Sequence, residues 1–197
     1  MRRIFKLLVI SILVLLVIII TRALLHTPDT SSLQETVDYS LDEDLMLAHL
    51  SESIRFKTIS HENSQGLNAG AFDNFQAWVS QTYSQLHQTL ELKMFNGTML
   101  YKWVGTDPTL KPILLTGHYD VVPIIPGTES LWQQPPFSGT IDDGFVWGRG
   151  ALDDKSGVIG ILEATSYLIA GGYQPKRTIY LSFGHDEEIG GAKGAGL

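Results

Sequence analysis

One histidine and five carboxylates stand in three short clusters, and their residue types are those of metal ligands. The clusters are GHYD, GRGALDDKSG and GHDEE, and the candidates are His118, Asp120, Asp153, Asp154, Glu187 and Glu188. Carboxylates that converge without compensating charge repel one another unless cations lie between them. Histidine with carboxylates and no thiol suits zinc, and also cobalt or manganese. Taken alone, a histidine near an aspartate or two adjacent acidic residues more often belong to the protein surface or core. A metal site therefore requires the three clusters to lie together.

The segment GRGALDDKSG resembles a phosphate-binding loop in composition but lacks its essential spacing. Such a loop needs a glycine directly before the lysine, so that bare backbone N–H groups can surround a phosphate. Here Asp154 stands before Lys155 and would place negative charge against an anion. We therefore expect a cation as the ligand of this segment.

Two apolar runs place the histidine and glutamate clusters at the ends of strands. KPILLTGHYDVV predicts a buried central strand that ends near His118, and RTIYLSFG predicts another that ends just before His185. A helix is expected from about Lys155 to Ala170, directly after the aspartates. Open α/β sheets bind ligands at the carboxyl ends of their strands, so this order of elements brings the clusters together.

The elements upstream complete an α/β pattern. Ser40 and Glu43 form a capping box before one helix, and apolar spacing from 72 to 86 predicts a second. Two alternating runs around Asn96-Gly97 predict a tight hairpin, although NGT is also a glycosylation sequon. We expect an α/β layered sheet with helices on both faces.

The N-terminus has the pattern of a membrane signal. Three basic residues precede an almost entirely aliphatic run, Leu7 to Thr21. We expect residues 1–27 to form an uncleaved signal anchor and 28–39 a linker, with the fold in 40–197. Basic residues before the run predict a cytoplasmic N-terminus and a catalytic domain outside the cytoplasm, or a secreted protein if the signal is cleaved.

The composition excludes some functions. With 14 basic and 21 acidic residues the formal charge is -7, which disfavours nucleic acid as a partner. The absence of cysteine excludes disulfides and thiolate metal sites. The oligomeric state is left open.

Four ordered motifs connect residues 41 to 197 to a known family. GHYDVVP, a tryptophan followed by PPFSG, DGFVWGRGALDDK and GHDEE resemble the co-catalytic metallopeptidases that include carboxypeptidase S, aminoacylase and succinyl-diaminopimelate desuccinylase. The resemblance is closest to the carboxypeptidase S and N-acyl-amino-acid hydrolase branch. It implies a zinc-exopeptidase-like catalytic domain.

The resemblance also implies a role for each site residue. His118 resembles a ligand of one zinc ion, and Asp120 the residue that orients its ring. Asp153 resembles the carboxylate that bridges two metals, with a cis peptide bond after it. Glu187 resembles the general base, and Glu188 a ligand of the other zinc. Lys155 and Arg149 are expected to organise loops, and His185 to be structural.

The implied reaction is hydrolysis of an amide bond that releases an amino acid from a short peptide or an N-acyl amino acid. Family members carry a further acidic ligand, a lid domain and a late histidine, so the chain resembles their N-terminal part. We expect little activity from it alone. One alternative is a membrane-tethered, non-catalytic module that binds a metal or a partner through a sheet edge. Another is a cytosolic aminoacylase or desuccinylase, which the N-terminal run disfavours.

Overall fold

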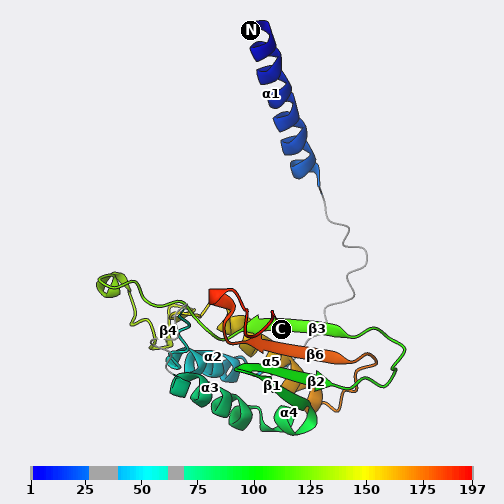
Figure 1. Cartoon of the computed structure of the whole chain (residues 1–197), viewed down its shortest axis with the longest axis vertical. Coiled ribbons are helices and arrows are strands. Elements are labelled where there is room, and N and C mark those ends of the chain that lie inside the picture. Colours follow the sequence, from blue (N-terminus) through cyan, green and yellow to red (C-terminus); the bar gives the residue numbers. More distant parts are fainter. Residues whose placement is uncertain (1, 27–39, 62–68, 197) are drawn as a thin grey trace. The chain divides into compact units, whose positions relative to one another are not determined.

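The computed structural model describes residues 2–26, 40–61 and 69–196, and the chain divides into two compact units, 1–40 and 41–197 (Figure 1). The first unit contains helix α1 (Arg2–Leu25), with 24 residues and a mean hydropathy of 3.1 over its most apolar window. A membrane span needs about 20 apolar residues. By length and composition α1 can therefore cross a membrane, and a signal sequence has the same features. The predicted linker 28–39 lies outside the described residues.

A four-stranded sheet organises the second unit. Its order is β1 (Glu91–Phe95), β2 (Thr98–Trp103), β6 (Ile179–Gly184) and β3 (Ile113–His118). β3 and β6 are parallel, whereas β1–β2 and β2–β6 are antiparallel. In this register His118 lies opposite Gly184, so both parallel strands end at the same edge of the sheet. The two clusters that follow these strands therefore emerge side by side.

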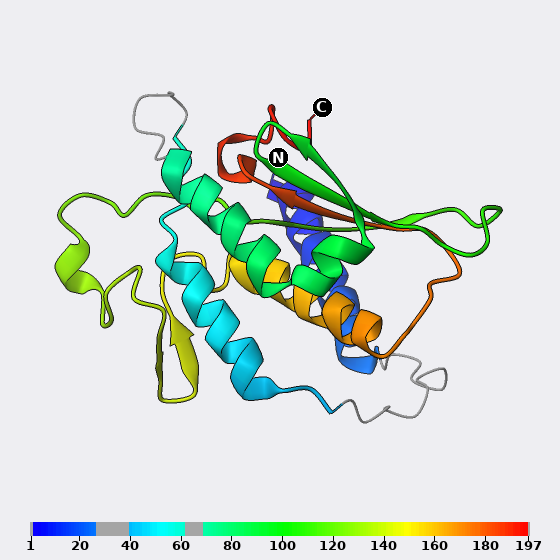
Figure 2. The same ribbon diagram turned by 90° about the horizontal axis from the view of Figure 1, so that it is seen from below.

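Helices cover one face of this sheet. They are α3 (Ala69–Thr82), α4 (Ser84–Thr89) and α5 (Lys155–Ala170), which Figure 2 shows on the same side of the strands, while α2 (Glu43–Arg55) packs against α5. The core between the two layers includes Phe75, Leu86, Tyr101, Leu162 and Phe183, all fully buried. Burial of this apolar area is the main stabilising term of the fold.

The α/β class is confirmed, but the expected helices on both faces are not seen. Within the described part of the second unit, the face opposite α5 carries no helix (Figure 1). Leu114 on that face is 59% exposed. Periodicity shows which residues of a strand are apolar but not whether one or both faces of the sheet are covered. The prediction of helices on both faces therefore had no direct support in the sequence pattern.

β3 was predicted to be a buried central strand, and this is wrong for the described residues. The strand lies at the edge of the sheet with β6 as its partner, and Ile113, Leu114 and Leu115 are 39–59% exposed. A short apolar run indicates a strand, but its position within the sheet depends on pairing that the run does not contain. The predicted end near His118 is confirmed.

Two helix predictions also need correction. The N-cap of α2 is Asp42, whose carboxylate accepts a hydrogen bond from the N–H of Leu45 at 3.0 Å, and not Ser40. Aspartate is as good a cap as serine, and Asp42 stands directly before the first helical residue. The amphipathic segment from 72 to 86 forms two helices, because Tyr83 interrupts it with non-helical angles.

The predicted hairpin is confirmed. β1 and β2 pair around Asn96, whose φ of 53° is in the left-handed region that asparagine tolerates. The side-chain amide of Asn96 donates a hydrogen bond to the carbonyl of Lys193 at 2.7 Å. The turn interpretation of NGT therefore accounts for this asparagine.

Candidate metal centre

His118 is held at the end of β3 with one ring nitrogen turned away from the sheet. The residue is only 8% exposed. Its Nδ1 lies 3.1 Å from the backbone oxygen of Asp120 and 3.3 Å from that residue's Oδ1. Nε2 faces the opposite way and lies 3.0 Å from Oδ1 of Asp153. A histidine held through one nitrogen offers the other to a metal.

Asp120 connects the two strand ends. Its side chain is fully buried, and its two oxygens accept the backbone N–H groups of Glu187 and Glu188, each at 3.1 Å. Burial opposes its ionisation, but hydrogen bonds, led by that from His118, hold the pKa of Asp120 below its usual value. A buried, ionised Asp120 therefore fixes the turn η2 (Glu187–Ile189) beside the histidine.

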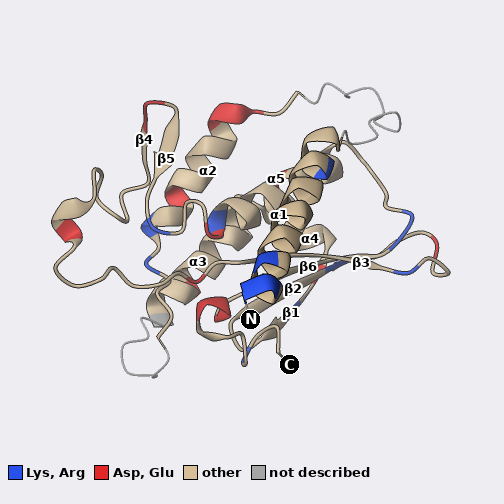
Figure 3. Cartoon of the chain, turned by 90° about the horizontal axis from the view of Figure 1, so that it is seen from above, with Lys and Arg blue, Asp and Glu red and all other residues tan. Residues whose placement is uncertain are grey.

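Asp153 reaches the same point from the loop before α5. The peptide bond between Asp153 and Asp154 is cis, as the family resemblance implied. The side chain of Asp153 is 77% exposed, so the site is open to solvent on this side. Figure 3 shows acidic residues (red) at the start of α5 and in the turn after β6.

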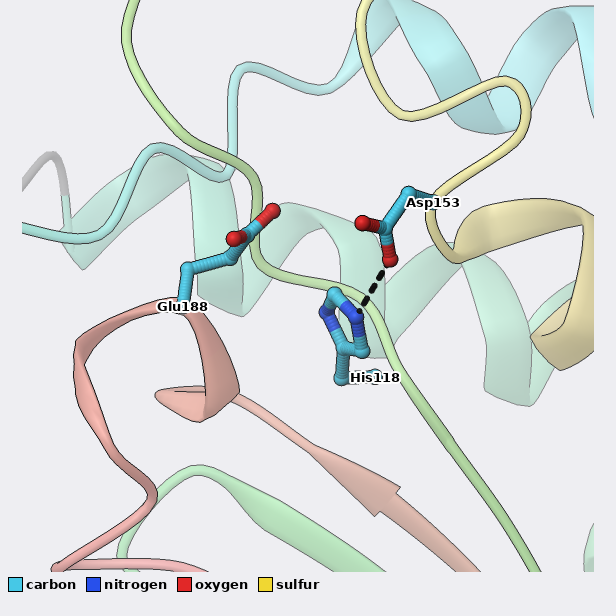
Figure 4. Close-up of side chains that lie close together, drawn as sticks. All are labelled: His118, Asp153 and Glu188. Carbon is cyan, nitrogen blue, oxygen red and sulfur yellow. Dashed lines mark hydrogen bonds and ion pairs between the residues drawn. The ribbon is translucent and has the colours of Figure 1, made fainter. Parts of the chain in front are cut away.

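Three predicted ligands converge. His118, Asp153 and Glu188 each place one ligand atom within 4.8 Å of the others. Figure 4 shows their side chains pointing toward a common position from β3, from the loop before α5 and from the turn after β6. Glu187 is not in this group, but its Oε2 lies 3.6 Å from Nε2 of His118 and its side chain is 62% exposed. The fold thus places Glu187 beside His118, Asp153 and Glu188 but outside their group.

The electrostatics of the site favour a cation. Burial alone would lower the pKa of His118, but the hydrogen bond and charge of Asp120, with Asp153, raise it to about 9. Burial and then the charge of Asp153 raise the pKa of Glu188. In the described part of the chain, no Lys or Arg forms an ion pair with Asp153, Glu187 or Glu188. One imidazole nitrogen and two carboxylates without fixed positive charge fit a divalent metal ion.

The expected structural residues lie outside the ligand group. Lys155 is fully buried and donates hydrogen bonds to the carbonyls of Ser53 and Phe56. The guanidinium of Arg149 lies 5.2 Å from the ring centre of Trp132. Nδ1 of His185 lies 2.9 Å from the hydroxyl of Thr98 in the hairpin. These contacts agree with structural roles for all three residues.

Sequence reasoning did not predict the contact that Asp154 makes. Oδ2 of Asp154 accepts the backbone N–H of His118 at 3.3 Å, although no role in contacts was predicted for this carboxylate. The glycines that make room for it, Gly117 and Gly157, are visible in the sequence, but periodicity does not show that they face each other.

Residues 114–197 match the sequence model of peptidase family M20/M25/M40. This part of the chain belongs to that family. The M20 segment lies within a longer region of similarity to curated relatives. The probable carboxypeptidase S-like 2 of Dictyostelium discoideum is 44% identical over 156 residues, which are 77% of this chain and 30% of that protein. Carboxypeptidase S of Saccharomyces cerevisiae is 44% identical over 127 residues, 63% of this chain and 22% of that protein.

The N-fatty-acyl-amino acid synthase/hydrolase PM20D1 of Xenopus tropicalis is 39% identical over 149 residues, 74% of this chain and 28% of that protein. The chain therefore spans 22–30% of the length of these three relatives.

Solved structures agree on the fold of the M20 segment and the elements before it. An M20 family metallo-carboxypeptidase from Sulfolobus solfataricus superposes with a TM-score of 0.59 at 26% identity, covering 75% of this chain and 32% of that one. Human carnosine dipeptidase 1 gives a TM-score of 0.61 at 23% identity, covering 77% and 34%. The second likeness concerns the fold alone.

Proposed function

We propose that this chain forms part of the metal centre of an enzyme that hydrolyses amide bonds. The observation that carries the proposal is the convergence of His118, Asp153 and Glu188 from three separate elements onto one solvent-accessible point. Zinc is the proposed metal, and cobalt or manganese would suit the same nitrogen and oxygen donors. The complete site would hold two ions.

Different residues of the chain have different proposed roles in the reaction. Metal ions bound here would polarise the amide carbonyl and lower the pKa of an attacking water. Asp120 fixes the His118 ring so that Nε2 faces the site. Glu187 is exposed, lies beside the ligands and outside their group, and is proposed to take the proton of the water and pass it to the leaving amine.

The proposed substrate is a short peptide or an N-acyl amino acid, and the product is a free amino acid. The support is the names of the relatives, a carboxypeptidase S and an N-fatty-acyl-amino acid synthase/hydrolase. The proposed ligands among the described residues number three, fewer than two tetrahedral ions take from protein. We therefore expect little turnover from this chain by itself.

Helix α1 is the proposed membrane anchor. It is long and apolar enough to span a bilayer, and Arg2, Arg3 and Lys6 lie at its N-terminal end, against Arg22 alone in its last turn. This arrangement supports a single span with a cytoplasmic N-terminus and the M20 segment outside the cytoplasm.

Zinc binding by the full chain in detergent tests the metal centre directly. Isothermal titration is expected to give near one zinc or more per chain, and binding should be lost in Asp153→Asn. The matched control is Asp143→Asn, which removes the same charge from an exposed turn whose positive φ asparagine tolerates. Absence of zinc binding by the unaltered chain would refute the proposal.

The exposed edge of the sheet supports the second candidate, a module that binds a partner. Ile113, Leu114 and Leu115 of β3 are 39–59% exposed, and uncovered edge strands are templates for pairing. A chain that binds no zinc but forms a defined complex through β3 would favour this function. Loss of the complex in Leu114→Lys would locate the interface.

A further inference from the structure

Three consecutive side chains, Asp153, Asp154 and Lys155, contact three different parts of the fold. Asp153 points toward His118 in the metal centre. Asp154 reaches the backbone of β3, and Lys155 reaches the end of α2. The start of α5 is thereby attached on three sides.

Asp154 stands at the N-cap of α5 but does not cap the helix. An aspartate at this position usually accepts a hydrogen bond from an N–H in the first turn, yet the side chain of Asp154 makes no such bond. Its Oδ2 instead accepts the N–H of His118 at 3.3 Å. Asp154 directly follows the proposed ligand Asp153, and its carboxylate binds the backbone of the proposed ligand His118.

Two glycines leave the space that this carboxylate fills. A Cβ at Gly157 would lie 2.3 Å from Oδ1 of Asp154, and a Cβ at Gly117 would lie 2.9 Å from Oδ2. A Cβ atom does not come this close to another atom, so a side chain at either position would displace the carboxylate. The carboxylate of Asp154 therefore lies between the end of β3 and the first turn of α5, in space that the two glycines leave free.

Lys155 holds the opposite side of the same turn. Its fully buried ammonium donates hydrogen bonds of 2.7 Å to the carbonyls of Ser53 and Phe56, and lies 5.3 Å from the ring centre of Phe75. These carbonyls also accept the backbone N–H groups of Phe56 and Thr58, so the lysine adds a second hydrogen bond to each. Because Lys155 is fixed to α2, a displacement of Asp154 would move the residue on its other side, Asp153.

We propose that Asp154 is a positioning residue of the metal centre, which sets the separation between His118 and Asp153 without binding the metal itself. The inference rests on the function proposed above. It also explains Gly117 and Gly157, because a side chain at either position would displace the carboxylate of Asp154.

The first test compares Asp154→Ala with Asp154→Asn in the full chain in detergent. Loss of an outer partner of a metal ligand typically weakens metal binding by about 10–100-fold, and we expect that loss for Asp154→Ala. Asp154→Asn keeps an acceptor oxygen and should recover part of the affinity. Without metal, the backbone amide hydrogen of His118 should exchange faster in Asp154→Ala than in the unaltered chain. A general loss of stability would instead speed up exchange over the whole sheet.

A second pair of variants acts on the same carboxylate from the helix. Gly157→Ala should displace Asp154 and weaken zinc binding, with circular dichroism unchanged. The control is Gly160→Ala on the same helix, where an added Cβ meets nothing within 4 Å and zinc binding should be unaffected. The visible spectrum of bound Co²⁺ should change in Gly157→Ala and not in Gly160→Ala, because it reports ligand geometry.

The outcomes separate the two proposals. If the unaltered chain binds no zinc, the metal centre is refuted and the role of Asp154 with it. If the unaltered chain binds zinc and both Asp154→Ala and Gly157→Ala bind it equally well, the positioning role is refuted and the metal centre stands.

Discussion

Asp120 acts on both sides of the metal centre although it is not a proposed ligand. It accepts a hydrogen bond from His118 and from the backbone of the two glutamates that follow β6. The sequence shows this residue two positions after the histidine, and the family resemblance gave it the orienting role. Its contact with Glu187 and Glu188 could not be predicted, because it depends on the pairing of strands far apart in the sequence.

Replacement of Asp120 by alanine should affect both affinity and stability. A buried donor left without an acceptor costs about 1–3 kcal/mol, and the N–H groups of Glu187 and Glu188 are partly buried, so the free energy of unfolding should fall by about that amount. Zinc affinity should fall by about 10–100-fold. Urea denaturation and zinc titration measure the two effects, with Glu129→Ala at an exposed position as control. An unchanged zinc affinity would remove the orienting role.

The adjacent glutamates should separate binding from catalysis. Glu188→Gln is expected to weaken zinc binding by more than about 100-fold, since even the loss of an outer partner costs about 10–100-fold. Glu187→Gln should bind zinc like the unaltered chain, because Glu187 lies outside the ligand group. The two variants differ from the original by the same chemical change, so each serves as the control for the other. Equal losses in both would contradict the division into base and ligand.

Helix α5 and strand β3 differ in how well the sequence predicted them. The helix was predicted with both ends correct, because its periodic apolar positions are followed directly by Gly171 and Gly172. The strand was also found, but its edge position was not. Local patterns report the element type, whereas the order β1-β2-β6-β3 arises from long-range pairing.

The packing of α5 on the sheet can be tested with two leucines of the same region. Leu162 is fully buried in the core, and Leu162→Ala should lower the free energy of unfolding by about 2–5 kcal/mol. Leu152 is 88% exposed just before the helix, and Leu152→Ala should change it by less than about 0.5 kcal/mol. Urea denaturation of the full chain in one detergent measures both. Similar effects would show that Leu162 does not belong to the core.

The chain as a whole consists of an apolar helix and a separate α/β unit. The proposed ligands all belong to the second unit, so the metal centre should not depend on α1. The sequence predicts an anchor over 1–27 and a linker before the fold from composition alone, because a long apolar run preceded by basic residues is distinct from the patterns of a layered sheet.

Removal of residues 1–40 should leave zinc affinity unchanged and release the protein from membranes. Extraction of expressing cells with alkaline carbonate measures the second effect, and zinc titration of both forms measures the first. Full chain found in the carbonate-soluble fraction would contradict the anchor. Altered zinc affinity of the shorter form would contradict the independence of the two units.

His118, Asp153 and Glu188 reach one point only when β3, α5 and the turn after β6 are in place, since His118 and Asp153 alone are 35 residues apart in the sequence. An unfolded chain has no such set of ligands, so an ion that binds here acts by mass action on the folding equilibrium. At a free metal concentration 100 times its dissociation constant, this effect amounts to about 2.7 kcal/mol. Metal availability would then set how much of the chain is folded, and chelation would expose it to proteolysis without any change in its sequence.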